Sequence, residues 1–542
     1  MRLLTTTTAL GSYIALARRR AQEENSSPIS ELPISELFPD GSSSRIQSDI
    51  GLVPTMGSLH QGHLSLIERA REENFIVIVS IFVNPLQFGI NEDFEQYPRN
   101  LKQDMVSCQR AGVDAIFAPA PEEMGILLKN KQESLVTQVI PPSAMISGLC
   151  GRSRLGHFEG VATIVTKLFN LVQPDRAYFG QKDGQQLAII KKLVADLNLP
   201  IEIVACPIVR EASGLALSSR NQYLSATQKQ KATVLYRSLQ TAQKAFRAGE
   251  RRCSKLIALA KQELIEISNL SVEYIELVEP STLMPIEQIK EEGMLAIASR
   301  IGPTRLIDNV ILRDRKPIIA IDGPAGAGKS TVARQVAAKL GLIYLDTGAM
   351  YRAVTWLVME KKIAIDDECA VAELVDEYEV ELTPSHDLKA PVRVWINGSD
   401  ITQIIRTPQV TANVSAIAAQ KAVRSALVKQ QQKWGKKGGL VAEGRDIGTH
   451  VFPDAEVKIF LTASVEERAR RRQQDFQRQG LSIMSLEQLE RDIAERDWKD
   501  STRKVSPLRK AKDAIELPSD GLDISEVTEN IVSQYQQYLT RQ

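Results

Sequence analysis

The chain has 542 residues, of which 67 are Lys or Arg and 66 are Asp or Glu, so its formal net charge at pH 7 is +1. This length predicts about three or four structural domains, and the balanced charge gives no general reason to expect nucleic acid or an anionic membrane as a partner. The five cysteines are scattered and form no CxxC pair, which favours reduced thiols in a cytoplasmic protein over disulfides or a zinc site.

The first fifty residues contain two segments of different composition. In "MRLLTTTTALGSYIALARRR" the basic cluster follows the apolar stretch, the reverse of a secretory signal, so a targeting peptide is the disfavoured alternative. Residues 21–48 are rich in Ser, Glu and Pro and contain "PISEL" twice in tandem, which predicts a mobile loop. The apolar runs farther along are too short for a spanning helix, so the chain is expected to be soluble.

Strand-like and helix-like patterns alternate along the first two hundred residues. Apolar runs that read as buried strands occupy residues 51–55, 75–83, 114–120, 176–180 and 201–209. Apolar residues recur at helical spacing in residues 63–74 and 184–198. This alternation predicts an α/β fold with a parallel, doubly wound sheet. A helical pattern over residues 222–267 and strands at 272–278, 294–299 and 305–312 predict a smaller α+β lobe.

The βα pattern starts afresh at "RDRKPIIAIDGPAGAGKST", where a new strand leads into a glycine-rich turn. We therefore place a domain boundary near Arg315, with a linker no longer than Arg313–Pro317. The first predicted domain is 1–314, divided into a nucleotide-binding part, 1–221, and the smaller lobe, 222–314. The second is 315–542, and its C-terminal end is expected to form long amphipathic helices.

Two of the five histidines, His60 and His63, stand three residues apart, and the turn Met56–Ser58 is expected just before their helix. At this spacing they share one helix face. A helix N-terminus attracts anions through its free N–H groups, and imidazoles add directional donors to phosphate oxygens. Gly62 between them allows a close approach. The alternative is a pair of polar capping residues.

The segment "PTMGSLHQGH" resembles the HxGH element of the nucleotidylyltransferase superfamily, which includes class I tRNA synthetases, and in its details it looks like the pantoate–β-alanine ligases (pantothenate synthetases). The resemblance extends over residues 50–312, through "NPLQFG" (84–89), "GHFEGVATIVTKLFNLVQPDRAYFGQKDGQQ" (156–186), "REASGLALSSRN" (210–221) and "TRLIDNVIL" (304–312).

This resemblance implies that a carboxylate attacks the α-phosphorus of ATP, giving an acyl-adenylate and pyrophosphate, and that an amine then attacks the acyl carbon. His60 and His63 would hold the triphosphate, with His63 as proton donor, and Lys182 would join them in catalysis. Gln87 and Gln186 would bind pantoate and β-alanine. The other ATP-binding residues that it implies are Met56, Gly57, Gly180, Gln181, Asp183, Val209, Leu217, Ser218, Ser219 and Arg220. For Lys182 and Arg220 the alternative is ordinary surface charge.

Three positions depart from that family's usual pattern. Gln181 stands where "GEKDFQQ" has an acid, Gly184 where it has an aromatic residue, and Ser213 where Asp is usual before "GLA". None of the three removes a phosphate-binding donor, so activity is expected, while the local geometry of these loops is open.

A second nucleotide motif, "GPAGAGKS", follows the strand-like run "IIAID" and precedes a helical pattern, which is the context of a P-loop. Lys329 is expected to reach the β- and γ-phosphates of ATP, and the Ser330 hydroxyl to meet Mg²⁺. Neither DxxG nor NKxD follows, which disfavours a GTPase. The predicted ATP-binding residues are Gly323, Pro324, Ala325, Gly326, Ala327, Gly328, Lys329, Ser330 and Thr331.

Arginines recur in the motif-like segments that follow: "LDTGAMYRA", "AVRSAL", "AEGRDIGT" and "ERDWKDSTR". Planar, permanently charged arginines suit a site that brings two phosphates together. From about Lys316 to the C-terminus these segments resemble the bacterial cytidylate kinases. By that resemblance Glu467–Arg472 would be a lid over ATP, although an arginine-rich helix face is more often simply solvated.

The same resemblance implies a role for each residue around CMP. Arg352, Arg445 and Arg503 would surround its phosphate. Ser415, Arg424 and Asp446 would face the cytosine, and Arg496 and Asp500 the sugar. Thr347 replaces the Ser of "DSGAMYR" and keeps its hydroxyl.

Together these patterns predict a cytoplasmic fusion of two Mg²⁺- and ATP-dependent enzymes, a pantoate–β-alanine ligase followed by a P-loop (d)CMP kinase. Its partners would be ATP, pantoate, β-alanine and CMP or dCMP, without nucleic acid or membrane, and it would form a homodimer through the ligase domain. Other substrates on the same folds are one alternative: nucleotidyl transfer to a phosphate acceptor in the first half, or UMP/CMP breadth in the second. A nucleotide-sensing regulator with one dead site is another.

Overall fold

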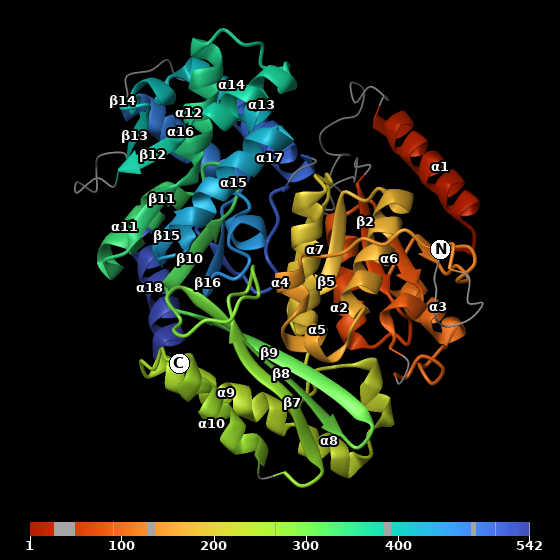
Figure 1. The fold of residues 1–542 in the computed structure, drawn as a ribbon. Helices are drawn as coiled ribbons and strands as arrows, with labels where there is room; N and C mark the ends of the chain where they lie inside the picture. Colours follow the sequence, from red (N-terminus) through yellow and green to blue (C-terminus); the bar gives the residue numbers. More distant parts are fainter. Residues whose placement is uncertain are drawn as a thin grey trace. The chain divides into compact units, whose positions relative to one another are not determined.

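The structure is a computed structural model that describes residues 1–25, 49–89, 92–126, 136–265, 267–383, 392–478, 484–503 and 506–540. The chain forms two compact units that divide between Asp314 and Arg315, and each is described here by itself (Figure 1). Within the described ranges no helix is both long and apolar enough to cross a membrane.

The first unit contains a six-stranded sheet in which every pair of neighbours is parallel, which confirms the predicted architecture. Its order is β1 (Arg2–Leu4), β4 (Ala115–Phe117), β3 (Ile76–Ile81), β2 (Ile50–Thr55), β5 (Arg176–Gly180) and β6 (Glu202–Cys206). The chain winds outward from β2 in one direction and from β5 in the other. In such sheets ligands bind beyond the carboxyl ends of the two strands where the winding reverses.

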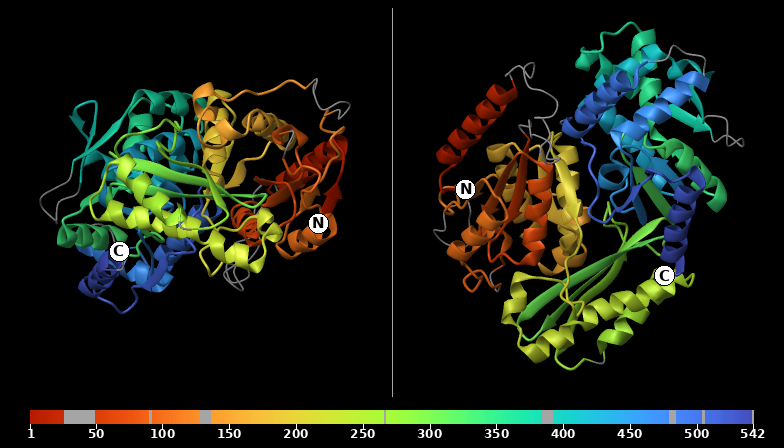
Figure 2. Two further views of the ribbon diagram at one scale, coloured as in Figure 1. Left: turned by 60° about the horizontal axis from the view of Figure 1, so that its bottom comes forward. Right: turned by 180° about the vertical axis from the view of Figure 1, so that it is seen from behind.

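Helices cover both faces of this sheet (Figure 2). One face packs against α1 (Thr7–Asn25), α6 (His157–Val172) and α7 (Gly184–Asp196), and the other against α2 (Gln61–Glu73) and α3 (Leu101–Arg110). Short elements fill the connections: η1 (Pro85–Gln87), α4 (Ser143–Ile146), α5 (Leu149–Ser153), η2 (Gln181–Asp183) and η3 (Ser219–Tyr223).

The N-terminal strand β1 and helix α1 were not predicted. Leu10 and Ile14 of α1 are buried against the sheet, and Thr7 donates from its N–H and its hydroxyl to Glu123 Oε1 at 2.7 Å each. Burying two such aliphatic side chains is worth about 3 to 6 kcal/mol, enough to hold a helix of weak amphipathic character. The mobile loop predicted for residues 21–48 is wrong for residues 21–25, which belong to α1, and residues 26–48 lie outside the described ranges.

The predicted smaller lobe is confirmed as three helices and a three-stranded antiparallel sheet. The elements are α8 (Ala226–Ala232), α9 (Val234–Arg247), α10 (Cys253–Ile265), β7 (Leu270–Val278), β8 (Glu292–Ile301) and β9 (Thr304–Arg313). Leu295 and Ile297 of β8 pack against α9 and α10, whereas Met294 and Ala296 point to the opposite face, toward α5 and α7. Because successive side chains of β8 point to opposite faces, this one strand contributes to two separate buried clusters.

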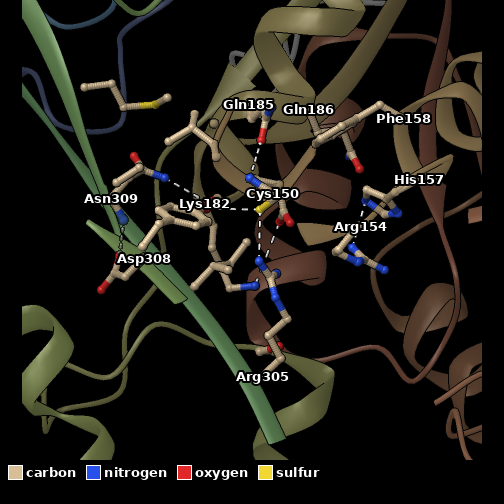
Figure 3. A pocket seen from close by; sticks show the side chains of 18 of the residues that line it. Cys150, Arg154, His157, Phe158, Lys182, Gln185, Gln186, Arg305, Asp308 and Asn309 are labelled. Carbon is tan, nitrogen blue, oxygen red and sulfur yellow. Dashed lines mark hydrogen bonds and ion pairs between the residues drawn. The ribbon is translucent and has the colours of Figure 1, made fainter. Parts of the chain in front are cut away.

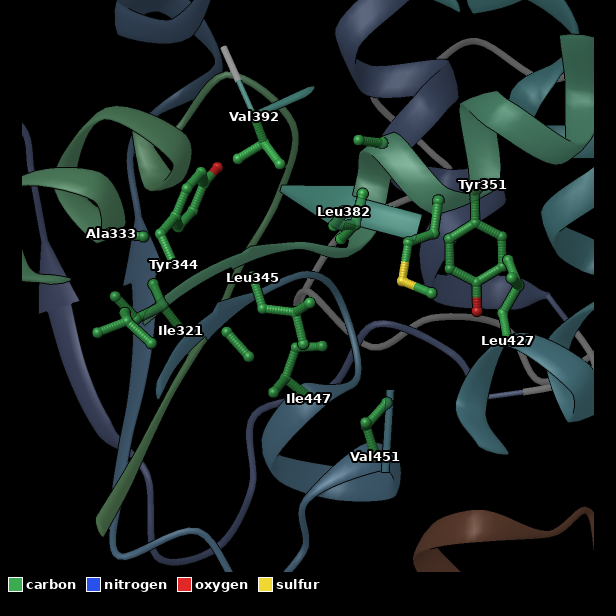
Figure 4. Close-up of a cluster of buried hydrophobic side chains, with 14 of the residues drawn as sticks. Ile321, Ala333, Tyr344, Leu345, Tyr351, Leu382, Val392, Leu427, Ile447 and Val451 are labelled. Carbon is green, nitrogen blue, oxygen red and sulfur yellow. The ribbon is translucent and has the colours of Figure 1, made fainter. Parts of the chain in front are cut away.

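The second unit is built on a five-stranded parallel sheet. Its order is β11 (Ile343–Asp346), β15 (Gly438–Glu443), β10 (Lys316–Asp322), β16 (Val457–Thr462) and β17 (Ile515–Pro518). Its core joins strand residues such as Ile321 and Leu345 to Tyr351 and Leu427 from the helices (Figure 4). A small antiparallel sheet, β12 (Val380–Thr383), β13 (Arg393–Ile396) and β14 (Ser399–Asp400), flanks it.

The helices of this unit are α11 (Lys329–Leu340), α12 (Thr347–Glu360), α13 (Glu368–Glu377), α14 (Pro408–Ala419), α15 (Lys421–Gly435), α16 (Val465–Arg478), α17 (Leu486–Thr502) and α18 (Ile524–Thr540), with the short turns η4 (Ile404–Arg406) and η5 (Ile447–Val451). The long C-terminal helices predicted from the sequence are confirmed as α16, α17 and α18. The strand β17 between them was missed, because four residues carry too little pattern.

Candidate active sites

The turn between β2 and α2 is held by a buried carboxylate. Asp104 of α3 is 2% exposed, and it accepts from the N–H groups of Ser58 and Leu59 at 2.8 Å each. Gly57 and Ser58 adopt positive φ angles of +84° and +52°, which this pair of bonds stabilises. Burial raises the pKa of Asp104. Asp104 lies 46 residues from Ser58, and no local motif marks it in the sequence.

His60 and His63 form a reciprocal cap on α2. His60 Nδ1 accepts from the Gly62 N–H at 3.1 Å, and His63 Nδ1 accepts from the His60 N–H at 3.4 Å. A nitrogen that accepts carries no proton, so both rings are in the tautomer with the proton on Nε2. A Cβ at position 62 would lie 2.9 Å from His60 Cε1, which explains the glycine.

Capping and phosphate binding are therefore compatible interpretations of these histidines. Burial, followed by the Lys182 charge, lowers the pKa of His60 to about 4. Burial, followed by His60 and Lys182, lowers the pKa of His63 to about 3. At neutral pH both rings are thus uncharged, and each offers an Nε2–H donor beside the helix N-terminus. Without a bound ligand, the lowered pKa of His63 favours hydrogen-bond donation by its neutral ring over transfer of a proton.

The second loop, which carries Lys182, follows β5, the strand next to β2 where the winding of the sheet reverses. Gly180 ends the strand, and Gln181, Lys182 and Asp183 form η2. The Asn309 side chain of β9 donates to the carbonyls of Gln181 and Lys182 at 2.9 Å each. A Cβ at Gly184 would lie 2.5 Å from Met294 Sδ, so methionine fills the space at this unusual glycine.

The third loop, residues 209–222, reaches toward the histidine turn. Leu217 N–H donates to Val209 O at 3.0 Å, and the Ser219 hydroxyl donates to Ser58 O at 3.3 Å. Ser218 caps η3. Arg220 is held by Asp93 through two bonds of 2.8 and 2.9 Å. Ser213, one of the unusual positions, is exposed, away from these contacts.

A cavity lies among the second and third loops, α5, the start of α6 and the smaller lobe (Figure 3). Five of the predicted residues line it: Lys182, Asp183, Gln186, Ser218 and Arg220. His60, His63, Met56, Gly57 and Gln87 are not among its lining residues, although Gln87 Nε2 contacts Met56 Sδ at 2.7 Å. The cavity is lined too by residues that we did not single out from the sequence, among them Cys150, Arg154, His157, Arg305, Asp308 and Asn309.

Arg154 and His157 connect this cavity to the segment of Gln87. The guanidinium of Arg154 binds Glu92 through two bonds of 2.6 Å, and its Nη1 lies 2.9 Å from His157 Nε2. His157 Nδ1 donates to Gln87 O at 2.8 Å. Burial and the Arg154 charge lower the pKa of His157 to about 3, so it is a neutral link. The sequence signal was available, since His157 stands in "GHFEG".

The P-loop joins β10 to α11 as predicted. Gly323, Gly326 and Gly328 have φ angles of +148°, +80° and +88°. A Cβ at Gly323 would lie 2.0 Å from Leu461 O of β16, so no other residue fits there. Pro324, Ala325 and Ala327 complete the turn, and Thr331 follows Ser330 on α11.

Lys329 and Ser330 are both engaged within the unit. Lys329 is 5% exposed, its Nζ donates to Pro324 O at 2.6 Å, and burial followed by Arg445 lowers its pKa. The Ser330 hydroxyl donates to Glu443 Oε2 at 2.9 Å. Glu443 ends β15 and was not singled out from the sequence. In the described ranges no group of three or more His, Cys, Asp or Glu could hold a metal ion.

Asp322 and Asp346, which end β10 and β11, organise the adjacent loops. Asp322 accepts from the N–H groups of Ile447 and Gly448 at 2.7 Å each, and burial raises its pKa to about 6. Asp346 caps α12 and pairs with Arg352 at 3.3 Å. Thr347 donates to Glu443 O at 2.7 Å, so its hydroxyl keeps a structural bond.

Asp446 lies between two of the predicted arginines. Its carboxylate pairs with Arg424, which is 1% exposed, and with Arg503 at 3.5 Å. Burial raises the pKa of Asp446, but Arg424 and then Arg503 lower it, and the net direction is downward. Ser415 is half-buried on α14.

The remaining arginines share few carboxylates within the residues that the structure describes. Arg445 pairs with Asp500 at 2.9 Å. Burial lowers the pKa of Arg496, and Arg445 lowers it further. The pKa of Arg406, which the sequence reasoning missed, is lowered by burial despite Asp346. In the described part of the chain the buried Nε atoms of Arg352 and Arg496 have no hydrogen-bond partner. Such a cluster favours an anionic ligand, because an anion would relieve the burial of positive charge.

The arginine-rich helix α16 contacts the P-loop. Arg468 is 4% exposed, donates to Ala325 O at 3.1 Å and pairs with Asp497. Arg471 donates to the hydroxyl and carbonyl of Ser519 at 3.0 and 2.8 Å. Arg470, by contrast, is 61% exposed. Two of the four arginines in Glu467–Arg472 therefore make specific contacts with other parts of the unit, which a simply solvated helix face would not make.

Comparison with known proteins matches each unit to a family. The pantoate-β-alanine ligase family matches residues 35–311, and the cytidylate kinase family matches residues 319–537. Proteins named bifunctional pantoate ligase/cytidylate kinase from Trichormus variabilis and Nostoc sp. are 72% identical over 541 and 542 residues, covering 100% of both chains in each case. The crystal structure of pantothenate synthetase from Thermus thermophilus is 40% identical and covers 57% of this chain and 99% of its own, with a TM-score of 0.48.

Both resemblances found in the sequence are therefore confirmed, and they occur in the same order along the whole chain. The chain belongs to the family of bifunctional pantoate ligase/cytidylate kinases, with the ligase family in its first unit and the P-loop kinase family in its second.

Proposed function

We propose that this chain catalyses two ATP-dependent reactions. Its first half condenses pantoate with β-alanine to pantothenate through pantoyl-adenylate, releasing pyrophosphate and AMP. Its second half transfers phosphate from ATP to CMP or dCMP. The observation that carries the proposal is where the candidate phosphate-binding residues lie. His60, His63 and Lys182 follow the carboxyl ends of β2 and β5, and Lys329 and Ser330 follow that of β10.

In the ligase half, the proposed triphosphate site lies at the N-terminus of α2. The Nε2–H groups of His60 and His63 would donate to phosphate oxygens, and Lys182 would supply the positive charge. Donors that are oriented in advance stabilise the charge that develops on pyrophosphate at little reorganisation cost. Arg220 and Ser218 would bind from the third loop, while Gln87 and Gln186 would orient pantoate.

In the kinase half, Arg352, Arg445 and Arg503 would bind the phosphate of CMP, and the P-loop that of ATP. Ser330 and Glu443 offer a hydroxyl and a carboxylate 2.9 Å apart, which suit Mg²⁺ because it prefers oxygen ligands and few protein groups. When bound, Mg²⁺ would neutralise charge on the β- and γ-phosphates. Contacts of Arg468 with the P-loop support α16 as part of the lid.

The proposal also covers cellular location, partners and oligomeric state. We place the chain in the cytoplasm, because its five cysteines are free thiols and no described helix could span a membrane. With a net charge of +1 we expect neither nucleic acid nor membrane as partner. We also propose a homodimer through the ligase half, which sedimentation of the full chain against residues 315–542 would test.

The decisive experiment measures product release by the purified full chain. We expect AMP when ATP, pantoate and β-alanine are supplied together, and ADP when ATP and CMP are supplied. Omitting β-alanine should stop turnover after one pantoyl-adenylate per site. ATP binding without AMP or ADP would instead favour a nucleotide-sensing regulator, and equal rates with CMP and UMP would favour a broad UMP/CMP kinase.

A further inference from the structure

We propose that Asn309, on β9 of the smaller lobe, is a positioning residue for Lys182 and so couples the lobe to the ligase reaction. The inference rests on the proposed ligase function, in which Lys182 supplies the cation of the triphosphate site. Asn309 is 6% exposed and lines the same cavity as Lys182 (Figure 3). Nothing in the sequence motif around Lys182 points to it, because 127 residues separate the two.

The geometry of the Asn309 amide carries the argument. Its nitrogen has two hydrogens, and it donates at 2.9 Å to each of two consecutive carbonyls, those of Gln181 and Lys182. Both donors are thereby used, and two successive peptide groups are anchored. Since the Lys182 carbonyl and side chain share one Cα, this clamp limits where the ammonium group can lie.

Gly184, which has no side chain, leaves room for the Asn309 amide and for Met294. A Cβ at Gly184 would lie 3.4 Å from Asn309 Nδ2 and 2.5 Å from Met294 Sδ, so a larger residue at 184 would require the lobe residues to shift. The Lys182 ammonium group is held more weakly, since Asp183 Oδ2 lies 3.9 Å away on a side chain that is 47% exposed. The main-chain contacts of Asn309 are thus the firmer constraint on this loop.

The neighbouring residue on β9 serves the third loop in the same way. Asp308 is 3% exposed and binds the Arg210 guanidinium through two bonds of 2.6 and 2.8 Å. Arg210 also donates to Gly214 O at 3.1 Å, and it stacks over Tyr236 of α9 at 4.0 Å. Adjacent residues of one lobe strand therefore hold the loops that carry Lys182 and Arg220.

The test uses the full chain, with its kinase rate as an internal measure of folded protein. Asn309→Ala should lower the ligase kcat about 10-fold, because small misplacement of a reacting group is costly, with a smaller effect on the KM for ATP. In a Lys182→Ala background the same change should cost less than about 2-fold, since the clamp then has nothing to position. Equal losses in both backgrounds would overturn the inference.

Leu306→Ala is the matched control, because Leu306 is buried on the same strand, in the core shared with α9 and α10, and does not line the cavity. It should lower the unfolding temperature and leave the ligase kcat unchanged. If it reproduces the Asn309→Ala profile, Asn309 is merely structural. Asn309→Asp should be at least as damaging as Asn309→Ala, because it faces two carbonyl oxygens with a carboxylate.

A measurement independent of activity separates this inference from the proposed function. The Lys182 charge contributes to the lowered pKa of His60, which is about 4, so a displaced Lys182 should let that pKa rise. NMR titration of His60 should show a rise in Lys182→Ala, part of that rise in Asn309→Ala, and none in Leu306→Ala. No rise in Asn309→Ala would overturn the clamp, whereas a chain that shows these rises but releases no AMP would refute the proposed function instead.

Discussion

The two nucleotide sites of this chain differ in the kind of charge that they use. In the proposed ligase site, His60 and His63 have pKa values lowered to about 4 and 3, so they would act as neutral donors, and Lys182 would supply the charge. In the kinase half, arginines share carboxylates, since Arg424 and Arg503 both pair with Asp446. Burial lowers the pKa of Arg503 and of Arg496. The proposed ligase site would therefore rely on oriented hydrogen-bond donors, and the proposed kinase site on permanent positive charge.

A physical reason for the contrast follows from the proposed reactions. A kinase must bring two phosphorylated substrates together, so it has to offset repulsion between anions, and arginine does this with planar, permanently charged donors. The proposed ligase site would hold one triphosphate at the N-terminus of α2, where the helix dipole already favours an anion. Neutral imidazoles there add donors without the cost of burying two further cations.

The largest effect is expected from a change at His63, and its absence would break this comparison. His63→Ala should lower pantoyl-adenylate formation on the order of 10²-fold or more, because one oriented donor is lost. His63→Gln, which keeps a neutral N–H, should retain more activity than His63→Ala. The measurement is AMP and pyrophosphate release, with CMP phosphorylation by the same sample as control. Normal ligase turnover in His63→Ala would contradict the phosphate-clamp role.

The next effect concerns the base that the kinase half accepts. Asp446 can accept from the amine of cytosine, whereas it would face a carbonyl of uracil, so CMP and dCMP should be used far better than UMP. Asp446→Ala should lower kcat/KM for CMP about 10- to 100-fold and narrow the gap to UMP. Because the change also removes the carboxylate that pairs with Arg424 and Arg503, Asp446→Asn is the matched variant.

Equal kcat/KM values for CMP and UMP in the unmodified enzyme would refute base recognition by Asp446. The unfolding temperature of each variant should be measured beside the kinetics. A loss of activity in Asp446→Ala that follows its loss of folded protein would assign the carboxylate a structural role.

A smaller effect is the response of each half to acid. The unfolded chain protonates histidine near pH 6.5, whereas folded His60 and His63 stay neutral to about pH 4 and 3, so their contribution to stability is lost as pH falls below 6.5. Between pH 6.5 and 5 this should lower the free energy of unfolding of residues 1–314 by about 1–2 kcal/mol per histidine. Urea unfolding of the wild type and of His60→Gln/His63→Gln, at both pH values, measures it.

Asp322 should respond with the opposite sign. Its folded pKa is raised to about 6, above the 3.8 of an ordinary Asp, so the folded state binds the proton more tightly and the contribution of Asp322 falls as pH rises from 3.8 to 6. Asp322→Asn should flatten that part of the pH dependence in residues 315–542. An unchanged pH profile would show that its carboxyl is not buried as described.

The smallest effect should come from cutting the chain between Asp314 and Arg315. Asp314 pairs with Arg251 of the first unit at 2.7 Å, and Arg315 pairs with Glu456 of the second at 3.1 Å, so the cut breaks neither. Each half has its own core and site, and should keep its rate within about 2-fold when expressed alone. If either half is insoluble while the full chain works, the boundary is misplaced or the halves fold together.

Local sequence was sufficient for the parts of both sites that lie on one strand, turn and helix. The strand before His60, the helix after it and the P-loop were predicted because backbone geometry there follows from contiguous residues: apolar strands, glycines at positive φ and a capped helix. The alternation of strand-like runs with helix-like segments was likewise enough to predict the doubly wound sheet. Its strands are buried on both faces and therefore appear in the sequence as continuous apolar runs. The roles assigned to individual substrate-binding residues stay predictions.

The tertiary structure alone decided which distant groups support these motifs. Asp104 holds the histidine turn, Asn309 clamps the Lys182 loop, and Glu443 meets Ser330 from 113 residues away. The strand β1 and helix α1 depend in the same way on Ala115–Phe117 and Glu123. None of these contacts leaves a periodicity or spacing in the sequence, because a hydrogen bond between two strands or loops depends on where the sheet places them and not on their separation along the chain.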